Sequence, residues 1–166
     1  MYKKILVPLD GSELAEQALP QVSQLAGCMG AQVVLLRVPG ESVYSYLVPD
    51  PDIAVEMRHD IETAAQVYLD EIASEFRVMN LAVSTLVVWG APVPDTIIQV
   101  ARQIEADLIV MSTHGRGGVA RLVIGSVADD VVRHAPVPVL LVRPNIPRVE
   151  NEKIRKQNKP IEPVLN

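Results

Sequence analysis

The chain has 166 residues, the length of one domain or of one domain with an arm. Hydrophobic residues make up 49% of it and charged residues 21%, which is enough apolar material for a core and excludes global disorder. The net charge of −5 and the aromatic share of 4% argue against a nucleic-acid-binding surface, because such surfaces are basic or stack bases on aromatic rings.

The start of the chain leads directly into an apolar run. It has neither a long apolar stretch nor a small-residue cleavage site, so no secretory signal is expected there. No run approaches the roughly 18 apolar residues that span a bilayer. A single cysteine, Cys28, excludes an internal disulfide and a cysteine-rich zinc module, and we expect it to be a small core residue. These features predict a cytoplasmic protein that does not enter a membrane.

Five apolar runs, rich in β-branched residues, predict the strands. The runs are nearly continuous rather than alternating, which is typical of parallel strands that are covered on both faces. They are Ile5–Leu9, Val33–Val38, Val83–Trp89, Leu108–Met111 and Val137–Val142.

The first helical pattern follows the first run, with Ser12 as its expected N-cap. Pro20 lies inside this pattern, and we expect it to kink the helix rather than to end it. The apolar positions that recur every three to four residues are Leu14, Ala18, Val22 and Leu25.

Three further helices are expected along the chain. A segment from Pro39 to Pro51, with three prolines and two tyrosines, predicts a loop or flap, and a long helix should follow from about Asp52 to Phe76. Helical spacing returns between Ile97 and Ile104 and again after Gly125. Alternation of strands and helices predicts a doubly wound α/β domain, a parallel five-stranded sheet with helices on both faces.

Ligands of such a sheet bind beyond the carboxyl ends of its strands, near the point where the strand order reverses. The segment Ser112 to Gly118 is the richest of these ends, with three glycines in four residues beside two hydroxyls and a guanidinium. Gly125 and Ser126 follow ten residues after Gly115, directly before a helical pattern. Glycines let backbone N–H groups approach an oxyanion, and a helix N-terminus adds unpaired donors and a favourable dipole. The pair of glycine elements therefore predicts an anion cradle.

Two side chains at this edge have alternative roles. Ser126 could donate its hydroxyl to a phosphate, or it could only cap the helix, with Asp129 completing a capping box. Asp10, at the end of the first run, could accept from ribose hydroxyls or hold a cation, or it could cap the first helix. The sequence leaves these alternatives open.

Other catalytic and metal motifs are weaker. The stretch from Gly115 to Ala120 matches a relaxed dinucleotide fingerprint but follows the fourth strand, and the chain has no P-loop and no G-x-S-x-G motif. The histidines His59, His114 and His134 lack the spacing of a metal site. We expect His114 to fix its loop by a hydrogen bond rather than to contact a phosphate or a sugar.

Three stretches resemble the universal stress protein family: Lys4 to Ser12 (KILVPLDGS), Ala106 to Met111 (ADLIVM) and Gly115-x9-Gly125-Ser126. The closing HAPVPVLLVRP is also similar to that family, and the resemblance covers residues 1 to about 144. It implies a Rossmann-like, adenine nucleotide alpha hydrolase-like fold with strand order 3-2-1-4-5, and a homodimer. It also implies the ATP-binding subgroup, whose motif is G-x-x-G-x9-G-[ST].

This chain matches that motif except at the first glycine, where it has Ser112. In the family this glycine lies close to the ribose, so the side chain of Ser112 would reduce the space for the sugar, although its hydroxyl could itself bond the sugar. The resemblance implies Asp10 near the ribose, where it could also contact an ATP-bound magnesium ion, and Val38 at the adenine edge through its backbone. It places the phosphates at Gly115, Gly125, Ser126 and Val127. The full set of implied nucleotide contacts is Pro8, Leu9, Asp10, Val38, Met111, Ser112, His114, Gly115, Arg116, Gly125, Ser126 and Val127.

The last apolar run, Val137–Val142, would be an edge strand in that order. A bare apolar edge invites aggregation, and pairing with a second copy across a two-fold axis would cover it. We therefore expect a homodimer through this edge, with Pro138 near the start of the strand, where its missing N–H is not needed.

Composition changes after Pro144. Residues 145–166, here called the arm, hold five basic and three acidic residues, a balance of +2 that leaves −7 for the body. We divide the chain into a domain, residues 1–144, and this arm. The arm is either a solvated tail or a segment that packs on an acidic face of the body or on a partner subunit, and the second is our hypothesis.

Three functions fit these features. The first is an ATP-binding, homodimeric regulatory protein in stress response whose nucleotide state sets its contacts with unknown protein partners. The second is a slow ATPase or autophosphorylating enzyme with Ser126 or a nearby hydroxyl as acceptor, although no general base is evident and Arg116 and Arg121 are its only nearby cations. The third is a nucleotide-free dimeric scaffold, which Ser112 leaves open.

Overall fold

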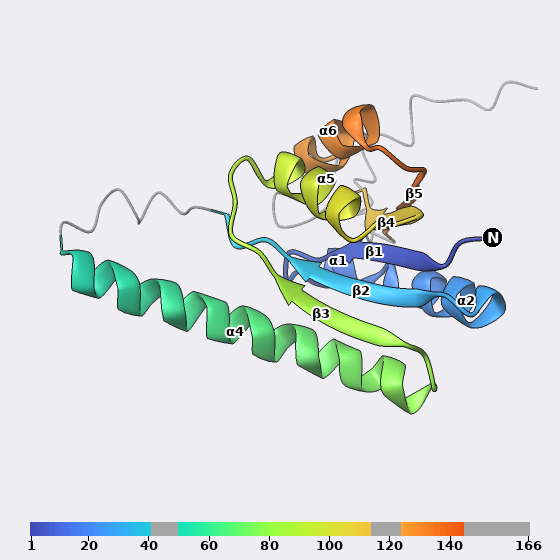
Figure 1. Cartoon of the computed structure of the whole chain (residues 1–166), viewed down its shortest axis with the longest axis horizontal. Helices are drawn as coiled ribbons and strands as arrows, with labels where there is room; N and C mark the ends of the chain where they lie inside the picture. The colour runs from blue at the N-terminus through green and yellow to red at the C-terminus, as the bar shows by residue number, and fades with distance from the viewer. Residues whose placement is uncertain (41–49, 114–123, 145–166) are drawn as a thin grey trace, which may run out of the picture.

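The computed structural model describes residues 1–40, 50–113 and 124–144 of the chain. Its strands form one parallel five-stranded sheet in the order β3-β2-β1-β4-β5 (Figure 1). The strands are β1 (Lys4–Pro8), β2 (Gln32–Arg37), β3 (Val83–Val87), β4 (Leu108–Ser112) and β5 (Val139–Val142). The predicted fold class and strand order are thus confirmed.

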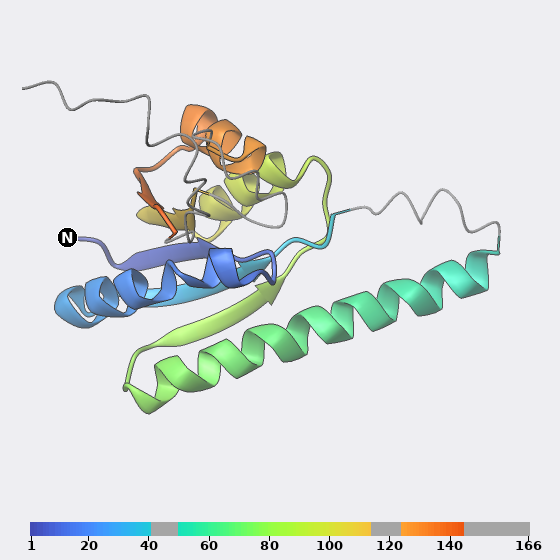
Figure 2. The same ribbon diagram turned by 180° about the vertical axis from the view of Figure 1, so that it is seen from behind.

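Helices cover both faces of the sheet, as predicted. Figures 1 and 2 show α1, α2 and α4 on one face and α5 and α6 on the other, in agreement with the two apolar clusters. The helices are α1 (Glu13–Glu16), α2 (Leu19–Met29), α4 (Pro51–Val78), α5 (Val93–Gln103) and α6 (Ser126–His134).

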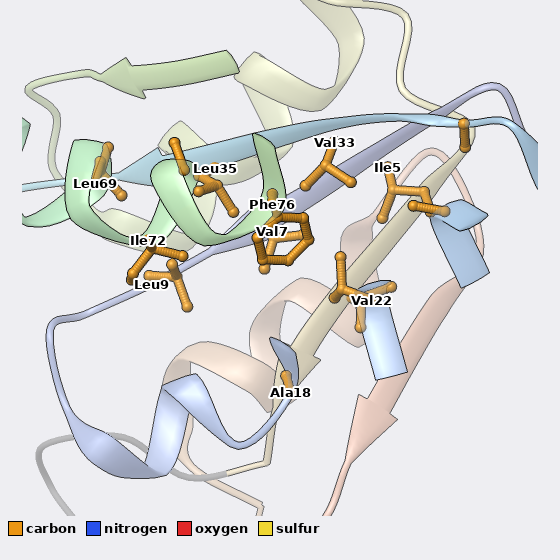
Figure 3. Packing of buried hydrophobic residues seen from close by; sticks show 14 of the residues in the cluster. Ile5, Val7, Leu9, Ala18, Val22, Val33, Leu35, Leu69, Ile72 and Phe76 are labelled. Carbon is orange, nitrogen blue, oxygen red and sulfur yellow. The ribbon is translucent and has the colours of Figure 1, made fainter. Parts of the chain in front are cut away.

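The central strands supply side chains to two apolar clusters. Ile5 and Val7 of β1 face the cluster under α2 and α4, while Leu6 between them faces the cluster under α5 and α6. Figure 3 shows the first cluster, which includes Phe76 of α4 and Val7 of β1. Both faces of β1 are therefore buried, which is why its sequence is continuously apolar.

The edge strands are less buried than the continuous runs predicted. Every residue of β3 is only half-buried, and Leu140 of β5 is 38% exposed. The last strand also begins at Val139, two residues later than expected, so Pro138 lies just before it and its carbonyl accepts a hydrogen bond from the Ile109 N–H at 3.0 Å. These two strands are the edges of the described sheet, and each has a neighbouring strand on one side only, which leaves it more exposed. Sequence hydrophobicity does not show which apolar runs become edge strands.

The first predicted helix is two helices. Ser12 is confirmed as the N-cap of α1, where its Oγ accepts from the Ala15 N–H at 3.2 Å. The predicted kink at Pro20 is wrong: α1 ends at Glu16, and Pro20 stands in the first turn of α2. In a first turn the missing proline N–H removes no intrahelical hydrogen bond.

The prediction that Cys28 is a core residue is also wrong. Val22 and Ala26 are the buried residues of α2, and Cys28 is exposed. Two positions beyond Ala26 correspond to about 200° around the helix, which places Cys28 on the solvent side.

Gly90, which follows β3, occupies a position with no room for a side chain. A Cβ there would overlap Thr96 Oγ1 and lie 2.8 Å from Thr96 Cγ2. Thr96 is buried and donates its hydroxyl to the Pro92 carbonyl at 3.2 Å, which holds it in place. We expect Gly90→Ala to lower the free energy of unfolding by about 2 kcal/mol, as overpacking does, in denaturant titrations.

A second variant removes the Thr96 side-chain atoms that the new Cβ would meet. Thr96→Ala takes away both Oγ1 and Cγ2, so the double variant should recover at least half of the loss after correction for Thr96→Ala alone. Equal stability of Gly90→Ala and the unmodified chain would contradict the steric account.

Candidate functional site

The strand order reverses between β1 and β4. β1 pairs with β2 on one side and with β4 on the other, in a register that sets Ile5 beside Leu108. The carboxyl ends of β1 and β4 are therefore neighbours, and the helices that follow them, α1 and α2 after β1 and α6 after β4, pack on opposite faces of the sheet. This is the place where an open α/β sheet binds its ligands.

Asp10 is held at the carboxyl end of β1 by its own loop. Its Oδ1 accepts from the Ser12 backbone N–H at 3.0 Å and from the Ser12 hydroxyl at 2.6 Å. Ser12, not Asp10, caps α1, so the alternative role proposed for Asp10 falls to its neighbour. Asp10 stays half-buried at the switch point with its carboxylate oriented by these bonds.

The N-terminus of α6 is fastened to the end of β4. The Gly125 N–H donates to the Thr113 carbonyl at 2.8 Å, and the Thr113 N–H donates to the Val142 carbonyl at 2.9 Å. The first bond brings together the two sides of the glycine-rich segment, residues 114–123, which lies outside the described residues, and the second ties the end of β4 to β5. The first turn of α6 is thereby set beside the carboxyl end of β4.

The alternative that Ser126 caps α6 is wrong. Gly125 is the N-cap, without a side-chain cap hydrogen bond, and Ser126 is the first helical residue. Asp129 pairs instead with Arg133 at 2.9 Å, which lowers the pKa of its carboxyl through that hydrogen bond. The first N–H groups of a helix have no intrahelical acceptor, so this glycine-capped turn presents donors and a positive dipole end.

The other predicted site residues lie at the same edge but differ in exposure. Pro8 ends β1 and is half-buried, and Val127 in the first turn of α6 is half-buried as well. The side chains that are buried are Leu9, Val38, Met111 and Ser112, at 3%, 8%, 6% and 6% exposure. His114, Gly115 and Arg116 lie outside the described residues. The described part thus brings Asp10, Ser112 and Gly125 to neighbouring strand ends.

Two polar residues that sequence reasoning did not single out make hydrogen bonds to residues near Asp10 in the chain. Arg37, the last residue of β2, donates from Nη1 to the Leu9 carbonyl at 3.1 Å. Tyr68 of α4 donates its hydroxyl to Glu16 Oε1 at 3.0 Å. For Arg37 the sequence held one signal, a charged residue near the end of an otherwise apolar run. For the Tyr68–Glu16 contact it held none, because these residues are 52 positions apart.

Burial and the hydrogen bond to Glu16 raise the pKa of Tyr68 above its ordinary value. Because the folded state favours the neutral phenol, this interaction stabilises the fold fully below the ordinary pKa near 10 and is lost as the pH rises above it. We expect the absorbance step of Tyr68, taken as the difference between the unmodified chain and Tyr68→Phe, at higher pH in folded protein than in denaturant. Coincident steps in the two states would contradict the assignment.

Two negative findings concern the described residues. In the ranges 1–40, 50–113 and 124–144 no group of three or more histidine, cysteine, aspartate or glutamate side chains is arranged to hold a metal ion. None of the helices in those ranges combines the length and the apolar character needed to cross a membrane.

Comparison with known proteins agrees with this geometry. The sequence matches the universal stress protein family over residues 1–143. The chain belongs to that family. A putative universal stress protein of Staphylococcus epidermidis is 36% identical over 143 residues, which are 86% of this chain and 84% of that protein.

Solved universal stress protein structures have the same fold. The universal stress protein UspA from Lactobacillus plantarum is 30% identical, with a TM-score of 0.72 over 86% of this chain and 98% of that one. A universal stress protein in complex with cAMP is 22% identical, with a TM-score of 0.61 over 86% of this chain and 98% of that one. The family and the Rossmann-like fold predicted from the sequence are therefore confirmed.

Proposed function

We propose that this universal stress protein binds ATP at the carboxyl edge of its sheet and acts as a cytoplasmic, homodimeric nucleotide switch in stress response. The observation that supports this most is the first turn of α6, capped by Gly125 and tied to Thr113 at the end of β4. A phosphate chain at this position would meet backbone N–H donors and the positive end of a helix dipole. No cluster of cations is needed for such a site.

The residues around this turn fit the remaining parts of an adenine nucleotide. Asp10 would accept from the ribose hydroxyls and could share a magnesium ion with the phosphates. Val38, directly after β2, would offer its backbone to the adenine while its side chain stays in the core. The cAMP complex supports the proposal because a protein of this fold holds an adenine nucleotide.

The proposal is tested first on the purified protein without added ligand. Heat denaturation followed by chromatography and mass spectrometry should release an adenine nucleotide, and calorimetry on nucleotide-free protein should show ATP binding. Absence of both results would favour the nucleotide-free scaffold. Phosphate release above background that Gly125→Val abolishes would favour the slow ATPase.

The homodimer is proposed through the edge of β5. In the described sheet β5 pairs with β4 alone, and its Leu140 is 38% exposed. We expect Leu140→Lys to shift a dimer to a monomer at micromolar concentration, measured by light scattering after gel filtration, because a charged side chain on an edge strand opposes its pairing with a second copy. Val67→Lys is the control and should stay dimeric. Val67 is an exposed residue of α4, the helix that packs beside β3 at the other edge of the sheet.

A further inference from the structure

The first half of α4 stands away from the body of the domain. Residues 52–64 include no buried residue, and Ala65, at 7% exposure, is the first that packs into the core. Figures 1 and 2 show this half projecting past the carboxyl ends of the strands, while the second half lies along β3. One contact ties this half to the body: the Arg58 guanidinium lies 4.6 Å from the centre of the Trp89 ring. Helices with few tertiary contacts are marginal in water, so a partner for this half would stabilise it.

An apolar row runs along the projecting half. Ile53, Met57 and Ile61 follow one another at intervals of four, which places them on one face of the helix. Their exposed fractions are 50%, 36% and 39%. Val55, 69% exposed, lies off this row, and charged residues occupy much of the remaining surface of this half. Such an apolar row on an exposed helix is typical of a surface covered by another segment.

Acidic residues border this row. Glu56 and Asp60 each lie three positions beyond a member of the row and so stand next to it on the helix surface. From residue 50 to residue 62 five acidic residues stand against one arginine, Arg58. Two copies of this surface would repel each other, so the partner is a segment that is both aliphatic and basic.

The arm has that composition. Its centre reads Lys153-Ile154-Arg155-Lys156, and further aliphatic residues stand on both sides of it, at Ile146, Val149 and Ile161. The body up to Arg143 carries −7 and the arm +2, so a net basic segment follows the acidic body directly. Charge and hydropathy of the arm therefore complement the projecting half of α4.

The arm is also long enough and starts at the right edge. It leaves the carboxyl end of β5, and all five strands are parallel, so it starts at the edge past which α4 projects. Four strand spacings separate β5 from β3, about 19 Å, whereas the ten residues from Asn145 to Ile154 can span about 33 Å when extended.

We propose that the arm of the same molecule docks on the projecting half of α4, with Ile154 on the row of Ile53, Met57 and Ile61 and the flanking basic residues beside Glu56 and Asp60. This inference is independent of nucleotide binding and is tested without nucleotide. It assigns a role to the one part of the chain that lies beyond the matched family region, residues 1–143.

The test is amide hydrogen exchange of residues 52–64 in the full chain. Charge reversal in the arm (Lys153→Glu, Arg155→Glu and Lys156→Glu together) should speed exchange in this segment at least tenfold and leave the segment 65–76 unchanged. The matched control, Glu150→Lys with Glu152→Lys, alters the same arm in the opposite sense and should not speed exchange. Equal exchange in the charge-reversed and unmodified chains would overturn the proposal.

Two further measurements define the contact. Adding Glu56→Lys and Asp60→Lys to the charge-reversed arm should restore slow exchange, since both partners then carry the opposite charge. A disulfide between Met57→Cys and Ile154→Cys, in a Cys28→Ser background, should form within one chain at any protein concentration. A disulfide that joins two chains instead would place the arm on a partner copy and would overturn docking within the molecule.

Discussion

Gly125→Val is expected to weaken ATP binding at least 100-fold in isothermal calorimetry while the domain stays folded. The 100-fold change corresponds to about 2.7 kcal/mol of binding free energy. The reason is the position of Gly125 as N-cap of α6: a β-branched side chain there would stand over the first-turn N–H groups that are proposed to hold the phosphates. The same result is expected for Gly115→Val in the glycine-rich segment.

The backbone of Gly125 makes this a test of binding rather than of folding. Its φ of −58° and ψ of 149° are extended backbone angles that any residue adopts. Valine is a poorer N-cap than glycine, so a loss of stability of up to about 1 kcal/mol is expected and is checked by thermal unfolding.

Gly27→Val is the matched control for this experiment. Gly27 is an exposed residue of α2, and a Cβ there would meet only Leu81 Cδ2 at 3.8 Å, an ordinary contact. This variant should bind ATP as the unmodified chain does. Unchanged affinity in a folded Gly125→Val variant would contradict the cradle at α6.

The sheet could be predicted from the sequence because its signals are local or repeat along the chain. Continuous apolar runs marked β1, β2 and β4, and the helical spacing after Asp52 marked α4 almost to the residue. The strand order came from the family resemblance, not from the runs themselves. The depth of burial at the edges, β3 and β5, did not follow from hydropathy because it depends on which strands have a neighbour on both sides.

The candidate site could be predicted only in part for the same reason. The glycine elements and Asp10 stand in the sequence at strand ends, where a topological rule applies. The contact of Tyr68 with Glu16 and the bond from Arg37 to Leu9 depend on how α4 and β2 lie against the end of β1, which no local pattern encodes. Ser12 caps its helix and Ser126 does not, because a cap depends on the residue at which the helix begins. Hydrophobic periodicity locates that residue only to within one or two positions.

Phe76→Ala is expected to cause the largest loss of stability, about 3–5 kcal/mol in denaturant titrations. Phe76 is the only phenylalanine of the chain and is 1% exposed, in the cluster where α4 meets β1 and β2 (Figure 3). Removal of its ring leaves a cavity at the one stretch where α4 is anchored, since the half before Ala65 has no buried residue.

Two variants on the same helix separate this cavity effect from a loss of helix. Val67→Ala, at a position that is 54% exposed, should change the free energy of unfolding by less than about 0.5 kcal/mol. Phe76→Leu keeps most of the buried volume and should cost clearly less than Phe76→Ala. Because total stabilities are about 5–15 kcal/mol, the alanine variant should unfold within the first part of the titration. A loss of less than about 1 kcal/mol in the free energy of unfolding of Phe76→Ala would mean that contacts outside this cluster hold α4 to the sheet.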